Sequence, residues 1–212
     1  MGKTAITFSV DIEASGPIPG PWWMCSFGIC RTDDVQVGIK RELKPLEIPG
    51  LSEPDNPAAM KVVAAGLQEV NWDSGRTDIE NVAAVRAHFE ENGCDPRQAM
   101  VDLEDFIKEQ CGKNRGVVIG SPVTFDFMWL YWYAWRLLGK MPEFGYSGLD
   151  LRSYFMGMHG VGFLGTGKAR YLKHYPNEFE HSHDPLEDAR QQGAIWRDMV
   201  NARLARKEEE RS

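Results

Sequence analysis

The first residues that could do chemistry are two acids near the start of the chain. Asp11 and Glu13 lie two positions apart, at the end of a segment rich in β-branched and aromatic residues. In a β-strand, side chains two positions apart leave the same face. Adjacent carboxylates repel each other, and burying them is costly unless a cation lies between them. The pair is therefore either a solvated strand end or half of a divalent metal site.

A third acid lies among apolar side chains in the segment SPVTFDFMWL. Asp126 stands between Phe125 and Phe127, and an acid surrounded by so much apolar surface requires a partner. The alternative is an Asp in the first turn of a helix, stabilised by the helix dipole. Taken alone, this segment leaves both interpretations open.

The segment HDPLEDARQQGAIW opens a helix and carries a fourth acid and a histidine. Asp184 and Glu187 match an N-cap and a capping-box acid, so both have structural roles. Asp188 has no such role and lies one turn into the helix, free to face the other carboxylates. His183 precedes the cap on backbone that is not yet helical. A histidine that titrates near neutrality suits the role of general base.

The elements that must position these residues form a mixed α/β domain. Strands are expected at residues 4–12, 24–31, 35–43 and 117–120, because these runs are apolar and β-branched. Helices are expected at 57–70, 78–90, from 96, at 125–138 and at 185–204, with a Gly-rich loop at 157–170. Residues 1–204 then make one domain, and the charged tail 205–212 is expected to fray. The Trp129–Trp135 stripe has helical spacing and is expected in the core.

Together, D-x-E on the first strand, F-D at a strand-to-helix junction and H-x4-D at the last helix resemble the DEDDh exonucleases. This branch of the ribonuclease H-like superfamily includes oligoribonuclease and proofreading subunits, and the motifs occur here in its order across most of the chain. The resemblance implies a ribonuclease H-like mixed β-sheet flanked by helices. It also implies four ligands of two divalent cations and a general base, which are Asp11, Glu13, Asp126, Asp188 and His183.

The implied reaction is metal-dependent 3′→5′ hydrolysis of single-stranded nucleic acid with a free 3′ end, releasing nucleoside 5′-monophosphates. Hydrolysis of a phosphodiester needs an activated water, neutralised phosphoryl oxygens and help for the leaving 3′ oxygen. Two cations roughly 3.5–4 Å apart supply all three. Four carboxylates balance the charge of two such cations, and hard oxygen ligands suit Mg²⁺ or Mn²⁺ rather than zinc.

The chain departs from the family pattern where relatives hold the 3′-terminal nucleotide. Residues 14–16 read Ala-Ser-Gly instead of Thr-Thr-Gly or similar, and residues 121–122 replace a frequent His-Asn pair. Stacking on a base is open to Trp22 and Trp23, with core packing as the alternative. Contact with substrate phosphates is open to Lys168 or Arg170, with a mobile loop as the alternative. The substrate-binding residues expected here are Ala14, Ser15, Trp22, Phe125 and Lys168. The choice between RNA and DNA depends on loop geometry, and we favour RNA.

Two other patterns have weaker chemical interpretations. The loop from Gly162 to Lys168 is similar to a phosphate-binding loop, but Ala169 stands where Ser or Thr must bind the metal. The histidines at 159, 174, 181 and 183 have irregular spacing and no nearby cysteines, so zinc is not expected. His181 also lacks the spacing to the acid of the last motif that identifies the base.

Composition limits the class of protein. The chain has 212 residues, 42% of them apolar, and a net charge of -7, which argues against a nonspecific basic coat for nucleic acid but not against a nuclease. No apolar run approaches about 18 residues and no signal peptide is evident, so we expect a cytoplasmic protein without a membrane partner. A homodimer is left open. The alternative functions are a noncatalytic nucleic-acid-binding module on the same fold and a metal-dependent hydrolase of a small phosphorylated metabolite.

Overall fold

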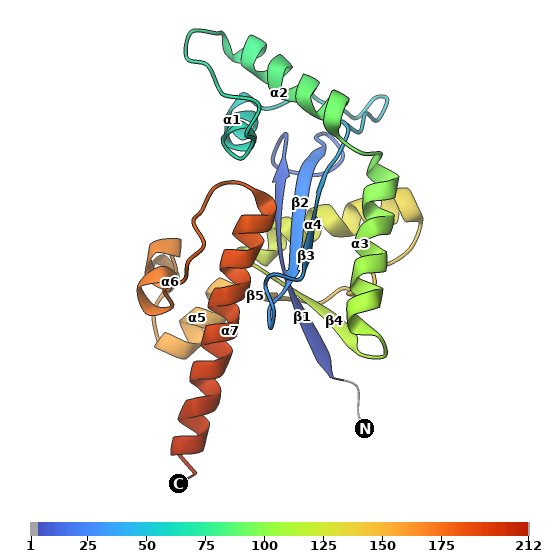
Figure 1. Ribbon diagram of the computed structural model, residues 1–212. Coiled ribbons are helices and arrows are strands. Elements are labelled where there is room, and N and C mark those ends of the chain that lie inside the picture. Colours follow the sequence, from blue (N-terminus) through green and yellow to red (C-terminus); the bar gives the residue numbers. More distant parts are fainter. Residues whose placement is uncertain (1–3, 212) are drawn as a thin grey trace.

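The computed structural model describes residues 4–211, and five strands within them form one mixed sheet (Figure 1). The strands β1 (Ala5–Ala14), β2 (Met24–Arg31) and β3 (Gly38–Glu42) pair as an antiparallel meander. The strands β4 (Arg115–Gly120) and β5 (Gly148–Asp150) extend the sheet in parallel to β1, in the order β3-β2-β1-β4-β5. The expected mixed α/β architecture is confirmed, and β5 is an addition to it.

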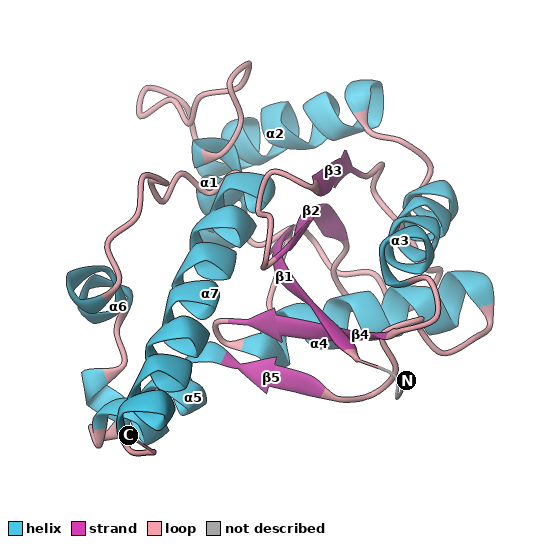
Figure 2. Cartoon of the chain, turned by 60° about the horizontal axis from the view of Figure 1, so that its bottom comes forward, coloured by secondary structure: helices cyan, strands magenta, loops and turns pink. Residues whose placement is uncertain are grey.

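Helices flank the sheet on both faces (Figure 2). They are α1 (Pro57–Ala65), α2 (Asp78–Asn92), α3 (Pro96–Cys111), α4 (Val123–Tyr133), α5 (Leu151–His159), α6 (Lys168–His174) and α7 (Pro185–Glu209). A π-helical turn, Ala134–Leu138, continues α4, and a short 3₁₀ turn, Phe163–Gly165, precedes α6. Within residues 4–211, no helix is both long enough and apolar enough to span a membrane.

Alternation along β1 sorts its side chains between the two faces of the sheet. Phe8, Val10 and Ile12 are buried in a core that also contains residues of α3 and α4. Ser9 and Asp11 face the opposite side, where α7 crosses β1. Because Asp11 and Glu13 share that face, the strand delivers both acids to α7 rather than to the apolar core.

Several expected boundaries are wrong. The loop expected at 157–170 contains the end of α5, the 3₁₀ turn and the start of α6. The helix that begins at Pro57 ends at Ala65, where Gly66 caps it, rather than at 70. At the other end of the chain, α7 continues beyond Leu204 to Glu209, because alanine and long charged residues are strong helix formers.

The aromatic stripe on α4 is only partly in the core. Trp129 and Tyr133 are fully buried, but Trp135 is 61% exposed, so the expectation of a buried Trp135 is wrong. At about 100° per residue, even a regular helix would place Trp135 about 120° from Trp129 and about 160° from Tyr133 around its axis. Trp135 therefore points away from the face that Trp129 and Tyr133 occupy, and its spacing from them does not favour the core.

Close approach of α7 to the sheet depends on glycine. A Cβ atom added to Gly28 of β2 would lie 2.3 Å from the backbone nitrogen of Leu186, in the first turn of α7. Further along the helix, a Cβ on Gly193 would lie 3.2 Å from the Cβ of Ser9. The start of α7, which carries Asp188, therefore rests on backbone that has no side chain.

We expect Gly28→Ala to destabilise the protein by about 1–3 kcal/mol, the usual cost of overpacking a tight contact. The added methyl must push the start of α7 away from β2, and Asp188 with it. Urea unfolding measures the loss of stability, and the rate of the hydrolysis expected from the sequence measures the displacement of Asp188. Gly157→Ala is the matched control, since a Cβ there meets nothing within 4 Å in the middle of α5. Equal unfolding curves for Gly28→Ala and the wild type would contradict this account of the packing.

Candidate active site

The expected acids converge where β1 ends and where α4 and α7 begin. Carboxylate oxygens of Asp11, Glu13 and Asp188 all lie within 4.8 Å of one another. Asp126, in the first turn of α4, accepts a hydrogen bond of 3.2 Å from the backbone nitrogen of Ile12, between the two acids of β1. Residues from three distant parts of the chain are thus brought to one place.

Asp126 is held by the short turn between β4 and α4. The side chain is buried, and the neighbouring Gly120 leaves room for it, because a Cβ there would lie 2.8 Å from Asp126 Oδ2. The start of the helix is fixed by Asp150, whose Oδ2 accepts a hydrogen bond of 3.2 Å from the nitrogen of Val123. Asp126 lies in the first turn of a helix, as one sequence interpretation predicts. It also lies beside the other acids, so the two interpretations do not exclude each other.

The start of α7 is fixed by its N-cap. Asp184 accepts hydrogen bonds from the nitrogens of Leu186 and Glu187, at 2.9 and 3.2 Å, and its other oxygen lies 2.9 Å from Lys40 Nζ. The expected cap is therefore confirmed. The expected capping-box role of Glu187 is wrong, because its carboxylate pairs with Arg190 Nη1 at 2.5 Å instead. Asp188 follows with its carboxylate turned into the cluster.

Gln192 is a site residue that the sequence reasoning missed. It lies one helical turn after Asp188 on α7, and its Nε2 donates a hydrogen bond of 2.8 Å to Asp11 Oδ1. Its own Oε1 is buried without a hydrogen-bond partner among the described residues. The spacing of four between Asp188 and Gln192 was the available signal, because residues four apart share a helix face.

The acids are electrostatically crowded. Burial, followed by the charge of Asp188, raises the pKa of Asp11 to about 8. Burial, followed by the charges of Asp11 and Asp188, raises the pKa of Glu13 to about 9. Burial, followed by the charge of Asp11, raises the pKa of Asp126 well above its ordinary value. Carboxylates this costly to ionise fit a site whose charge is balanced by cations.

The base expected from the sequence lies at the edge of this cluster. His183 Nδ1 is 3.6 Å from Glu13 Oε1, and the backbone of His183 has a positive φ of 60°. Its carbonyl packs on Gly66, where a Cβ would lie 2.0 Å from the carbonyl oxygen. Burial, followed by the charge of His181, lowers the pKa of His183 below its ordinary value, which favours the neutral form that can accept a proton.

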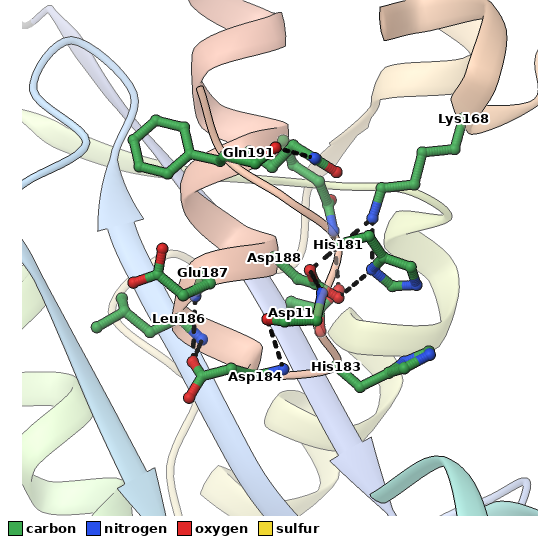
Figure 3. Close-up of polar contacts among 12 residues, drawn as sticks. Asp11, Lys168, His181, His183, Asp184, Leu186, Glu187, Asp188 and Gln191 are labelled. Carbon is green, nitrogen blue, oxygen red and sulfur yellow. Dashed lines mark hydrogen bonds and ion pairs between the residues drawn. The ribbon is translucent and has the colours of Figure 1, made fainter. Parts of the chain in front are cut away.

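His181 contacts the cluster as well, although its spacing to Asp188 predicts no role for it. Its Nδ1 lies 2.5 Å from Asp188 Oδ2, and its ring centroid is 4.2 Å from that of His183 (Figure 3). Lys168, the first residue of α6, approaches the same place. Its Nζ lies 2.7 Å from His181 Nδ1 and 3.9 Å from Asp188 Oδ1. His181 and Lys168 thus both lie against the carboxylate of Asp188.

Two cavities adjoin the acids and separate the expected substrate-binding residues. One of about 350 Å³ is lined by Glu13, Ala14 and Phe125 together with residues of α1. The other, of about 310 Å³, is lined by Asp11 and Lys168 together with residues of α5 and α7. The expected residues Ala14 and Phe125 therefore share one cavity, and Lys168 lies in the other.

Ser15 and Trp22 contact protein groups instead of lining these cavities. Ser15 is fully buried, and its Oγ accepts a hydrogen bond of 3.2 Å from the nitrogen of Trp23. Trp22 packs over Gly16, and its Nε1 donates a hydrogen bond of 3.1 Å to the carbonyl of Pro54. Both residues shape the loop after β1, beside the cavity that contains Ala14.

No family model matches the chain. In sequence it is similar to the 3′–5′ DNA exonuclease Cap18 of Escherichia coli, with 31% identity over 193 residues that cover 91% of this chain and 90% of that protein.

Solved structures of exonucleases share the fold. The nuclease domain of 3′hExo, a DEDDh family member bound to rAMP, has a TM-score of 0.64 at 14% identity and covers 93% of this chain and 92% of that one. Escherichia coli Exonuclease I in complex with a dT13 oligonucleotide has a TM-score of 0.60 at 17% identity, over 97% of this chain and 43% of that one. A 3′-exonuclease described for 3′-end-specific recognition of a histone mRNA stem-loop has a TM-score of 0.64.

These findings agree with the three motifs and with the convergence of their acids. The sequence relative is a 3′–5′ exonuclease matched over nearly the whole of both chains, and the structural neighbours include a DEDDh member. The chain belongs to the DEDDh family of 3′–5′ exonucleases.

Proposed function

We propose that this exonuclease removes nucleoside 5′-monophosphates from the 3′ end of single-stranded nucleic acid, using two divalent cations. The observation that carries the proposal is the buried cluster in which oxygens of Asp11, Glu13 and Asp188 lie within 4.8 Å of one another. Asp126 adds a fourth carboxylate through its hydrogen bond to the backbone between the first two. A noncatalytic binding module would have no use for acids at this electrostatic cost.

The donor set favours Mg²⁺ or Mn²⁺ as the cations. The four acids offer only carboxylate oxygens, which are the ligands that hard cations prefer. When bound, such cations supply the positive charge that phosphodiester hydrolysis requires at the attacking oxygen, the phosphoryl oxygens and the leaving oxygen. Gln192 orients Asp11 within this set through its hydrogen bond of 2.8 Å.

The protein groups have separate tasks in the reaction. His183 accepts a proton from the attacking water, and Glu13, 3.6 Å from its Nδ1, orients the ring. The water oxygen forms a bond to phosphorus as the bond from phosphorus to the 3′ oxygen breaks. That oxygen takes up a proton, which leaves a 5′-monophosphate and a strand with a new 3′-hydroxyl. The cavity beside Ala14 and Phe125 receives the terminal nucleoside, and Lys168 contacts a phosphate.

The sequence relative favours DNA as the substrate. Cap18 is named a DNA exonuclease, whereas the structural neighbours include one complexed with dT13 and one that recognises an mRNA stem-loop. The relative shares 31% identity with this chain, and the neighbours share 14–17%. We therefore propose single-stranded DNA, in place of the RNA preference expected from the sequence.

Cleavage should begin at a free 3′ end and proceed on linear single-stranded DNA faster than on RNA of the same sequence. Matched 5′-labelled oligonucleotides, assayed in Mg²⁺ and in Mn²⁺, measure both preferences, and chromatography identifies the mononucleotides. A circular strand of the same DNA is the control. Equal cutting of circular and linear strands would refute an exonuclease that acts from the end.

The metal-free protein should lose stability as pH rises. The folded pKa values of about 8 for Asp11 and about 9 for Glu13 exceed those of the unfolded chain, roughly 4. The stability that these groups contribute is complete below about pH 4 and is lost as pH rises through 8 to 9. Melting temperature measured in EDTA should follow this trend, and added Mg²⁺ or Mn²⁺ should raise it more at pH 8 than at pH 5.

The variant Asp11→Asn separates the loss of stability caused by the carboxylate cluster from the effects of other titrating groups. The variant keeps the shape of the side chain but removes one charge, so its melting temperature in EDTA should be higher at pH 8 and less dependent on pH. It should also abolish hydrolysis, because the site loses a ligand. A cation-induced shift that is equal at both pH values, or full activity in excess EDTA, would count against a carboxylate metal site.

His183→Ala should reduce turnover on the order of 10²–10⁴-fold, the usual contribution of a general base. Substrate affinity should change far less, because the carboxylates remain in place. Single-turnover rates measure the loss of turnover, and a separate binding assay measures substrate affinity. His181→Ala is the matched control and should stay near the wild-type rate. A dead His181→Ala together with an active His183→Ala would transfer the role of base to His181.

A further inference from the structure

Two histidines and one acid gather at the solvent edge of the active site. One ring nitrogen of His181, one of His183 and one oxygen of Asp188 lie within 4.8 Å of one another. His181 Nδ1 already lies 2.5 Å from Asp188 Oδ2. Among the described residues this is one of two such groups, and the other consists of Asp11, Glu13 and Asp188. The two groups share Asp188.

The donor atoms of the two groups suit different cations. The carboxylate group offers oxygen alone, whereas the histidine group offers two imidazole nitrogens and one oxygen, a set that suits zinc far better than Mg²⁺. Two nitrogens bound to one zinc ion at about 2.1 Å lie at most about 4.2 Å apart. Atoms that are now within 4.8 Å therefore need only small side-chain rotations to bind one ion.

The histidine group is accessible from solvent. The side chains of His181 and His183 are 44% and 34% exposed, whereas Asp188 is buried beneath them. Lys168 Nζ lies 2.7 Å from His181 Nδ1 and would have to withdraw before a cation could bind. Its long and flexible side chain is one-third exposed, so it can move to solvent without disturbing α6.

We propose that His181, His183 and Asp188 form a zinc site that inhibits the nuclease. This inference rests on the proposed function, because it makes zinc compete for two of the residues used there. A bound zinc ion would engage a ring nitrogen of His183 and so fix the ring that accepts the proton, would draw Asp188 away from the carboxylate group and would displace Lys168. Mg²⁺ supports activity through oxygen ligands, and zinc stops it through the adjacent nitrogens.

His181 is the residue that distinguishes this site from the carboxylate group. It contributes only to the histidine group, and the proposed reaction does not use it. The pair His159 and His174 provides a matched comparison, because their ring centroids are also close, at 4.5 Å, but they lie on α5 and α6 beside Tyr175. Within the described chain, neither belongs to a group of potential metal ligands.

The test is a zinc titration of the full chain in saturating Mg²⁺, with a labelled single-stranded oligonucleotide as substrate. We expect zinc to inhibit the wild type, and His181→Ala to raise the half-inhibitory concentration at least about 10-fold, since lost support of a ligand alone costs about that much affinity. His174→Ala should match the wild type. Inhibition that is equal in His181→Ala and the wild type would overturn the proposal and assign zinc to the carboxylates.

Direct binding separates this inference from the proposed function. Co²⁺ is added to wild type, His181→Ala and His174→Ala in excess Mg²⁺, and its visible absorption band reports nitrogen ligation. A band that is lost only in His181→Ala supports the zinc site. If the same preparation binds Co²⁺ in this way but hydrolyses no substrate, the proposed nuclease function fails and the zinc site stands. A band that is absent from the wild type, or unchanged in a folded His181→Ala, overturns it.

Discussion

Crowding of negative charge at the end of β1 is the constraint on which the rest of this structure depends. Asp11 and Glu13 leave the strand on the same face, and α7 brings Asp188 against them in a buried place. The approach is possible because Gly28 has no side chain under the start of α7. The charge of Lys168 and the hydrogen bond from Gln192 relieve only part of the repulsion. A fold that assembles such a cluster must have its charge balanced by bound protons or by cations.

The residues of the cluster could be predicted because each follows a local rule. Same-face acids at the end of a strand and an acid one turn beyond an N-cap are visible in a few consecutive letters, and the cap at Asp184 forms as its residue type predicts. The meander at the start of the chain follows from the apolar alternation of its strands. A net charge of -7 does not exclude a nuclease, since this acidic chain belongs to a family that acts on a polyanion.

What could not be predicted depends on contacts between distant segments. β5 is a strand of only three residues that exists because β4 lies beside it. The position of His181 is set by residues 175–184, which have no regular structure and therefore no sequence periodicity. The acids of the candidate site could thus be predicted from sequence, whereas the position of His181 and the cavities could not.

The left-handed backbone of His183 has a consequence for the evolution and engineering of this chain. A residue with a side chain at a φ of 60° is held at a cost of about 1–3 kcal/mol, and Gly66 leaves the space that its carbonyl occupies. Glycine would adopt the same backbone without that cost. With the role of general base that we propose for His183, thermostability and turnover pull position 183 in opposite directions. Selection for heat resistance alone would favour loss of the histidine, whereas selection for turnover retains it.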